Sequence, residues 1–199
     1  MSVTLTPMTA EELEPLLGPV QRSYAEELVR HRGVSAAEAL DRAAVPIREL
    51  LPAGAATEGV LLRTARVDGE AVGWIWVTLP GAAGATDAPP GSGRAWIHNI
   101  EVHPEHRGRG YARRMIQLVE AELARLGVPE LGLNVFGSNT VAIRLYESLG
   151  FRVTAQQMAK PVSSGPAGDA PSGPGGGAPS GPAGGPPSGP GGGASRDAG

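Results

Sequence analysis

"HRGRGYARRM", residues 106–115, is the stretch from which the fold of this 199-residue chain can be worked out. It places four arginines and two glycines between an apolar run at 96–102 and a helical pattern at 116–127. Positive side chains at a helix N-terminus oppose the helix dipole, so they cost stability unless an anion balances them. Gly108 and Gly110 let the backbone approach such an anion closely, and a diphosphate matches the combined donors.

Downstream of this stretch the hydrophobic pattern predicts four elements. They are a helix over 111–126, a strand over 130–136, a helix over 138–150 with Ser138 or Asn139 near its N-cap, and a final strand over 151–160. The buried face expected for the first of these helices consists of Tyr111, Met115, Leu118, Val119, Leu123 and Leu126.

Upstream, capping boxes predict where two helices begin, one at Thr9 with Glu12 and one at Ser35 with Glu38. We expect Gly18-Pro19 to interrupt the first helix, and Pro46 to kink the second. The apolar stripe expected on the second is Leu40, Ala43, Ala44, Ile47, Leu50 and Leu51. Asp68-Gly69 predicts a hairpin over 60–79. Further strands are expected over 2–8 and 94–102, which gives the order βααβββαβαβ.

Composition excludes several classes of function. The formal net charge is -3, so no global basic field attracts nucleic acid or an anionic membrane. The absence of cysteine excludes a disulfide framework, a thiolate zinc site and a cysteine nucleophile, and no metal site is predicted. No apolar run approaches the length of a membrane span, and the N-terminal residues are acidic where a signal peptide would be basic. We expect a cytoplasmic protein.

The composition changes near residue 163, which predicts a folded domain over 1–162 and a tail over 163–199. The tail holds 14 of the 30 glycines and 8 of the 19 prolines, but no leucine, isoleucine, valine or aromatic residue. Such a segment cannot bury a core, so a disordered Gly/Pro/Ser-rich tail is expected.

Three phosphate-binding motifs can be compared with the quoted stretch. A P-loop requires a lysine that is missing here. The dinucleotide fingerprint G-x-G-x-x-G fails because Arg113 stands at its third glycine, although Glu130 lies near the spacing of a ribose-binding acid. The pattern R-x-x-G-x-A, from Arg107 to Ala112, fits.

At these residues the chain resembles the GNAT superfamily of acyl-CoA N-acyltransferases. The resemblance covers about 96–153 and rests on two motifs. They are V-x-P-x-x-R-G-x-G from Val102 to Gly110, and N-x-x-A-x-x-L-Y-x-x-x-G-F from Asn139 to Phe151. It implies an α/β (α+β) fold with a mixed, mostly antiparallel central sheet flanked by helices, and acetyl-CoA as acyl donor.

The resemblance also implies roles for individual residues. The pyrophosphate of acetyl-CoA would be held by the loop of Arg107, Gly108, Arg109, Gly110, Tyr111 and Ala112. The backbone of Ile100, Glu101 and Val102 would pair with the pantetheine arm and thioester, along an edge exposed where strands 94–102 and 130–136 splay apart. Asn139 would touch the cofactor, and Tyr146 would protonate the departing thiolate.

The chemistry of amine acetylation fits these residues. Tyr146 is a suitable proton donor to a thiolate, although it could instead be a core aromatic. Without cysteine, direct attack in a ternary complex is favoured over a covalent intermediate on a cysteine.

The sequence identifies the general base less clearly than the cofactor-binding loop. Glu101 is favoured over His98 and His103, with a water relay as the alternative, and Asn134 stands where some family members carry a carboxylate. Strand alternation would place Glu101 and His98 on opposite faces. Trp74 and Trp76 share one face of their strand, and either wall the acceptor pocket or pack in the core.

Two functions therefore stay open. The first is an N-acetyltransferase acting on a primary amine of a small molecule, peptide or protein. The second is a non-catalytic domain that senses acyl-CoA or mediates an interaction. A homodimer is common among similar proteins, and the acceptor would be selected by the helical region 9–51 and the loop 80–93.

Deletion of residues 163–199 should leave the melting temperature and the acetyl-CoA affinity nearly unchanged, because the tail buries nothing. Thermal melts and cofactor titrations on both chains test this. A loss of several degrees or of cofactor binding would instead show that the tail docks on the domain.

Overall fold

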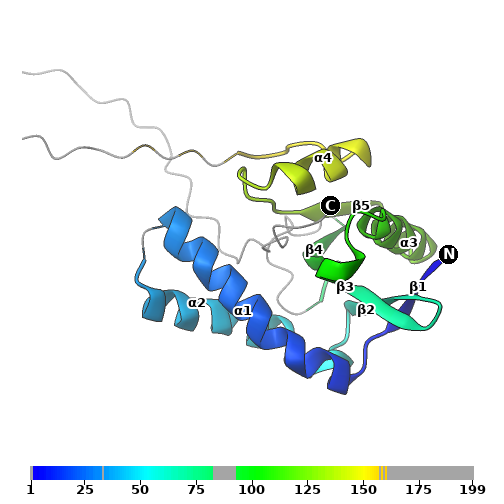
Figure 1. The fold of residues 1–199 in the computed structure, drawn as a ribbon, viewed down its shortest axis with the longest axis horizontal. Coiled ribbons are helices and arrows are strands. Elements are labelled where there is room, and N and C mark those ends of the chain that lie inside the picture. Colours follow the sequence, from blue (N-terminus) through cyan, green and yellow to red (C-terminus); the bar gives the residue numbers. More distant parts are fainter. Residues whose placement is uncertain (1, 33, 83–92, 157, 159, 161–199) are drawn as a thin grey trace, which may run out of the picture.

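A computed structural model of the chain describes residues 2–32, 34–82, 93–156, 158 and 160 (Figure 1). The expected tail, 163–199, and most of the loop predicted over 80–93 lie outside the described residues. Within the described ranges, no helix is both long and apolar enough to cross a membrane.

The core of the fold is a five-stranded sheet whose strands lie side by side in chain order. The strands are β1 (Val3–Pro7), β2 (Val60–Val67), β3 (Glu70–Thr78), β4 (Arg94–Val102) and β5 (Glu130–Leu133). Neighbours from β1 to β4 are antiparallel, and β5 joins β4 in parallel. The expected mixed, mostly antiparallel sheet is therefore confirmed.

The hairpin predicted over 60–79 is also confirmed. Asp68 and Gly69 connect β2 to β3 and both have positive φ, 51° and 88°. Two consecutive residues in that region make the type I′ turn that suits the twist of paired strands.

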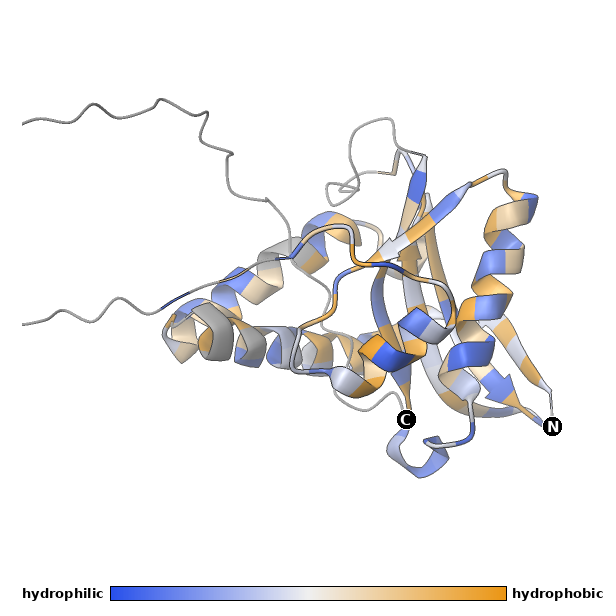
Figure 2. Cartoon of the chain, turned by 90° about the horizontal axis from the view of Figure 1, so that it is seen from above, coloured by the Kyte–Doolittle hydropathy of each residue, from blue (hydrophilic) through white to orange (hydrophobic). Residues whose placement is uncertain are grey.

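Four α-helices pack around the sheet in the part of the chain that the structure describes. They are α1 (Ala10–Arg32), α2 (Ala36–Leu50), α3 (Tyr111–Arg125) and α4 (Thr140–Ser148), with short 3-10 turns η1 (Gly54–Ala56) and η2 (Pro104–His106). Figures 1 and 2 show α1 and α2 on one side of the sheet and α3 on the other.

The sheet therefore separates two hydrophobic clusters. The cluster on the α3 side includes Ile75, Ile100 and Met115. The cluster on the α1/α2 side includes Leu13, Trp74 and Trp76.

The predicted capping box forms at Thr9 and Glu12, and Ser35 forms the predicted N-cap of α2. The Thr9 backbone N–H donates to Glu12 Oε2 at 2.9 Å, and the Glu12 N–H donates to Thr9 Oγ1 at 3.2 Å. Ser35 Oγ accepts from the Glu38 N–H at 3.3 Å.

The prediction that Gly18-Pro19 interrupts the first helix is wrong, because α1 continues through both Pro15 and Pro19. Apolar side chains along this part of α1 pack on the tryptophan face of the sheet: Leu13, Leu16, Leu17 and Val20. That packing outweighs the hydrogen bonds that the prolines remove. The backbone of α2 likewise stays helical through Pro46.

Some positions of the predicted helical stripes are exposed. Leu126 is 53% exposed, because it follows the last helical residue of α3 and precedes the left-handed turn at Gly127. Leu40 is also exposed on α2, where Ala39 takes the buried position.

The final strand predicted over 151–160 is absent from the residues of that segment that the structure describes. Val153 and Met158 are 77% and 86% exposed. Apart from Phe151, which packs against the cluster on the α3 side, the described residues of this segment are exposed and have no ladder partner, so an alternating pattern alone does not make it a strand. The strand predicted over 130–136 is also shorter, since β5 ends at Leu133.

Gly73→Ala should destabilise the fold by about 1–3 kcal/mol, because a Cβ there would lie 2.2 Å from the Glu101 carbonyl oxygen and 3.0 Å from Val102 Cα. Both obstacles are backbone of the paired strand β4, which cannot move without breaking the ladder. Melting curves should show the loss.

Gly137→Ala is the matched control, since its Cβ would meet nothing within 4 Å. Equal melting temperatures for the Gly73 and Gly137 variants would contradict the close approach of β3 and β4.

Candidate functional site

The strands β4 and β5 separate partway along their length. Their parallel pairing runs from Arg94 opposite Glu130 to Ile97 opposite Leu133, and β4 then continues alone to Val102. Along 98–102 the side of β4 that faced β5 therefore has no strand partner among the described residues. This is the splayed edge that the sequence predicted.

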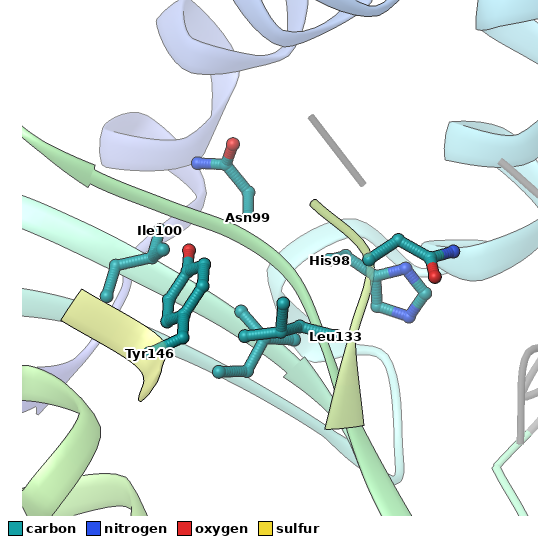
Figure 3. A pocket seen from close by; sticks show the side chains of 7 residues that line it. His98, Asn99, Ile100, Leu133 and Tyr146 are labelled. Atoms are coloured by element: carbon teal, nitrogen blue, oxygen red, sulfur yellow. The ribbon is translucent and has the colours of Figure 1, made fainter. Parts of the chain in front are cut away.

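A pocket lies at this separation, which we call the fork. It is a narrow hollow lined by Ile97, His98, Asn99, Ile100, Leu133, Asn134 and Tyr146. Figure 3 shows Tyr146 beside Ile100, with Asn99 extending from the opposite side of the strand. An extended ligand could hydrogen-bond to the β4 backbone here as an added strand does.

A β-bulge decides which side chains of β4 face which layer. Trp76 pairs with Asn99 but Val77 pairs with Ile97, so His98 is an extra residue on β4. Because one inserted residue reverses the alternation, Ile97 and Ile100 both face the α3 side. No glycine or other local signal marks this bulge in the sequence.

The bulge also overturns the expectation that Glu101 and His98 lie on opposite faces. The His98 ring lies 4.9 Å from the ring of Trp76, between centroids. Glu101 Oε2 accepts a hydrogen bond from Trp74 Nε1 at 3.2 Å. Trp74 and Trp76 share one face of β3, so both of these candidate bases are on the α1/α2 side.

Burial distinguishes Glu101 from His98, two of the three candidate bases; the third, His103, lies past the end of β4 at the start of η2. Burial lowers the pKa of His98 to about 4, so the imidazole is neutral at pH 7 and a weak acceptor for an ammonium proton. Glu101 is half-buried and is oriented by the indole of Trp74. Asn134, just past the end of β5, also lines the fork but offers no base.

The position of Tyr146 is compatible with both roles that the sequence left open, that of a core aromatic and that of a proton donor. Its side chain is only 3% exposed and belongs to the cluster on the α3 side, with its ring 5.7 Å from that of Phe151. It also lines the fork. Burial raises the pKa of its hydroxyl above the usual value, so the phenol keeps its proton at neutral pH.

Asn139 is the N-cap residue of α4, which was one of the two positions that the sequence predicted for this cap. Its Oδ1 accepts from the Ala142 backbone N–H at 3.1 Å and so caps α4. This cap fixes the start of the short helix that carries Tyr146.

The loop from Arg107 to Ala112 follows β4 through η2 and leads into α3. Gly108 and Gly110 have φ values of 73° and 76°, and a Cβ on either would meet nothing within 4 Å. Gly110 is the N-cap of α3 without a side-chain cap, and the first turn contains no acid. These features leave the helix N-terminus open to an anion.

The arginines of this loop are positioned by contacts within the chain. Arg107 Nε donates to the Val102 carbonyl at 3.1 Å, which ties the loop to the end of β4. Arg109 donates to the Glu105 carbonyl at 3.3 Å, and Arg113 donates to Ser148 Oγ at 2.6 Å. Tyr111 is half-buried and Ala112 is buried, so they anchor the first turn of α3.

No cluster of three or more histidine or acidic side chains suited to a metal ion occurs in the described part of the chain. The residues gathered at the fork and the loop instead offer backbone donors, a phenol and a carboxylate. That donor set fits a phosphorylated, extended ligand with a reactive group at the fork.

Comparison with known proteins gives consistent results. Residues 23–151 match the Acetyltransferase (GNAT) family. The uncharacterised N-acetyltransferase YycN of Bacillus subtilis is 30% identical over 161 residues, covering 80% of this chain and 99% of YycN. The uncharacterised N-acetyltransferase YdgE of the same organism is 26% identical over 80% of this chain and 98% of its own.

A solved structure shows the same fold. The crystal structure of the putative acetyltransferase YycN superposes with a TM-score of 0.71 at 28% identity, covering 82% of this chain and all of that one.

Gly110→Ala should weaken acetyl-CoA binding more than Gly127→Ala does, if the loop holds the phosphates. Both glycines flank α3 with similar φ, 76° and 70°, and open space around a Cβ, so both variants carry a similar backbone penalty of about 1–2 kcal/mol. Only the methyl at position 110 would stand where phosphates approach.

Calorimetric titration of acetyl-CoA against both variants, with melting curves, separates the two effects. Equal affinity in the two variants would remove the phosphate-binding interpretation of this loop.

Proposed function

We propose that this chain, which belongs to the acetyltransferase (GNAT) family, transfers the acetyl group of acetyl-CoA to a primary amine by direct attack in a ternary complex. The family consists of acetyl-CoA-dependent acyltransferases, and the relatives named above are N-acetyltransferases. The acceptor and the roles of individual residues are our proposal.

One observation carries the proposal: a single strand, β4, joins three features that the reaction needs. Its unpaired edge begins at the fork, its carboxylate Glu101 faces the α1/α2 side, and its end leads through η2 to the glycine loop. Tyr146 reaches the same fork from α4.

Acetyl-CoA fits this arrangement as a bound group. The backbone N–H groups of Gly108 to Ala112 would bind the pyrophosphate, with Arg107 and Arg109 adding positive charge. The backbone of Ile100 and Val102 would bind the pantetheine arm by strand addition. When bound, acetyl-CoA supplies an activated acetyl group and a thiolate leaving group.

Two side chains would move protons. Glu101, oriented by Trp74, would accept a proton from the ammonium of the acceptor, directly or through a water. Tyr146 would hold a proton at its hydroxyl, because burial raises its pKa, and would donate it to the leaving thiolate. Without cysteine in the chain, no covalent acetyl-cysteine can form.

Tyr146→Phe should lower kcat by about 10²-fold or more while acetyl-CoA affinity changes little, because the substitution removes only the hydroxyl of a buried ring. The assay is release of free thiol from acetyl-CoA with a panel of amines, and its background is low because the chain has no cysteine. The melting temperature should stay nearly unchanged, because Phe keeps the packing of the ring.

Wild-type turnover in this variant would refute the acid role. If the wild type acetylates no amine of the panel but binds coenzyme A tightly, the chain is instead a sensor of acyl-CoA.

A further inference from the structure

A group of buried polar side chains on the α1/α2 face of the sheet is not satisfied by the protein. Trp76, Thr78, Trp96, His98 and Asn99 are each between 1% and 8% exposed. Within the described ranges the following atoms have no hydrogen-bond partner: Trp76 Nε1, Thr78 Oγ1, Trp96 Nε1, His98 Nε2 and Asn99 Nδ2. Buried polar atoms without a partner are rare in folded proteins, so a concentration of them needs an explanation.

These side chains are neighbours, and we call them the polar cluster. Trp76 lies opposite Asn99 and Thr78 lies opposite Trp96 in the β3–β4 ladder, while the His98 ring packs on Trp76. His98 and Asn99 also line the fork with Tyr146 (Figure 3). The polar cluster therefore reaches from the proposed reaction centre along one face of the sheet.

Two other polar side chains on this face, those of Trp74 and Thr64, are hydrogen-bonded within the protein. The indole of Trp74 donates to Glu101, and the hydroxyl of Thr64 donates to Glu12 at 3.1 Å. The unsatisfied atoms of the polar cluster therefore lie along β3 and β4 on one side of the Trp74–Glu101 pair.

The chemistry of the polar cluster restricts the ligand. An indole N–H can only donate, so Trp76 and Trp96 require oxygen or nitrogen acceptors from outside the protein. Two arginines that the strands place on this side of the sheet, Arg66 and Arg94, are ion-paired with Glu12 and Glu130. A carboxylate would therefore be buried near Glu101 without a free countercharge from them, which is unfavourable.

We propose that the polar cluster is an oxygen-binding subsite for the acceptor, and that the acceptor is a hydroxylated amine, such as an amino sugar or amino alcohol, rather than a free amino acid. Its ammonium pairs with Glu101. Its neutral hydroxyl or ether oxygens accept from Trp76, Asn99 and Trp96, and Thr78 adds a hydroxyl that can donate or accept. This assignment rests on the proposed function, because it deepens the same site.

The spacing suits a small molecule. Glu101 and Asn99 are two residues apart on one face of β4, which corresponds to about 7 Å along a strand. An amine and a hydroxyl on one six-membered ring can span that interval. Thr78 and Trp96 lie farther from Glu101 along the strands and would contact a larger substituent on the acceptor.

The first test compares small amine acceptors that differ in their oxygen groups, in the thiol-release assay with the full chain. D-glucosamine and 2-deoxystreptamine carry ring hydroxyls, cyclohexylamine has the ring without oxygens, and L-alanine carries a carboxylate. We expect kcat/KM for at least one hydroxylated amine to exceed those for cyclohexylamine and L-alanine by about 10-fold or more.

The outcomes separate this inference from the proposed function. Preference for L-alanine or cyclohexylamine would overturn the subsite while keeping the acetyltransferase. No turnover with any amine would overturn both.

The second test uses two buried threonines of the same face. Thr78→Val removes a hydroxyl that the protein leaves unpaired, so the melting temperature should hold or rise while KM for the hydroxylated amine rises about 3- to 10-fold. KM for acetyl-CoA should not change.

Thr64→Val is the matched control, since it removes a hydroxyl already bonded to Glu12. It should lower the melting temperature and leave the acceptor KM unchanged. If Thr78→Val destabilises the protein without raising the acceptor KM, the polar cluster is structural and the subsite is refuted.

Discussion

The site depends on one constraint, which is that the backbone groups of a strand inside a protein must be hydrogen-bonded. The backbone of β4 is paired on both sides as far as Ile97, which lies opposite the last residue of β5. Among the described residues, β4 beyond Ile97 is paired on the β3 side only. The free edge is short, lies beside Tyr146 and leads directly to the glycine loop. In the proposed mechanism an extended thioester ligand completes the ladder that β5 leaves unfinished.

A second feature of the site is the bulge at His98. In the proposed mechanism it gives the side chains along this edge the orientation that the reaction needs. With regular alternation, the residues after Ile97 would have the opposite orientation, and Glu101 would point into the apolar cluster beneath α3. A carboxylate buried there would be costly. One inserted residue instead places Glu101 beside Trp74 and keeps Ile100 in that apolar cluster.

The sequence predicted the features that depend on local interactions. The structure has the backbone angles expected at Asp68-Gly69 and at Gly108 and Gly110, and it has the side-chain caps expected at the starts of α1 and α2. The errors concern long-range packing. Helix α1 passes Pro19 because the sheet supports it, and the described residues between Phe151 and residue 160 form no strand because no neighbour pairs with them. The bulge and the polar cluster depend on how β3 and β4 meet, which no single stretch of sequence encodes.

The sheet that separates the two hydrophobic clusters also has an evolutionary consequence. Substitutions at distant positions with no shared partner have nearly additive effects on stability. Changes among Trp76, Thr78 and Trp96 act on the layer under α1 and α2, whereas the glycine loop begins the helix that packs on the other layer. Under the proposed function, a lineage could therefore acquire a new acceptor by mutation of one layer while the other continued to bind the same donor, so donor and acceptor specificity would diverge at independent rates.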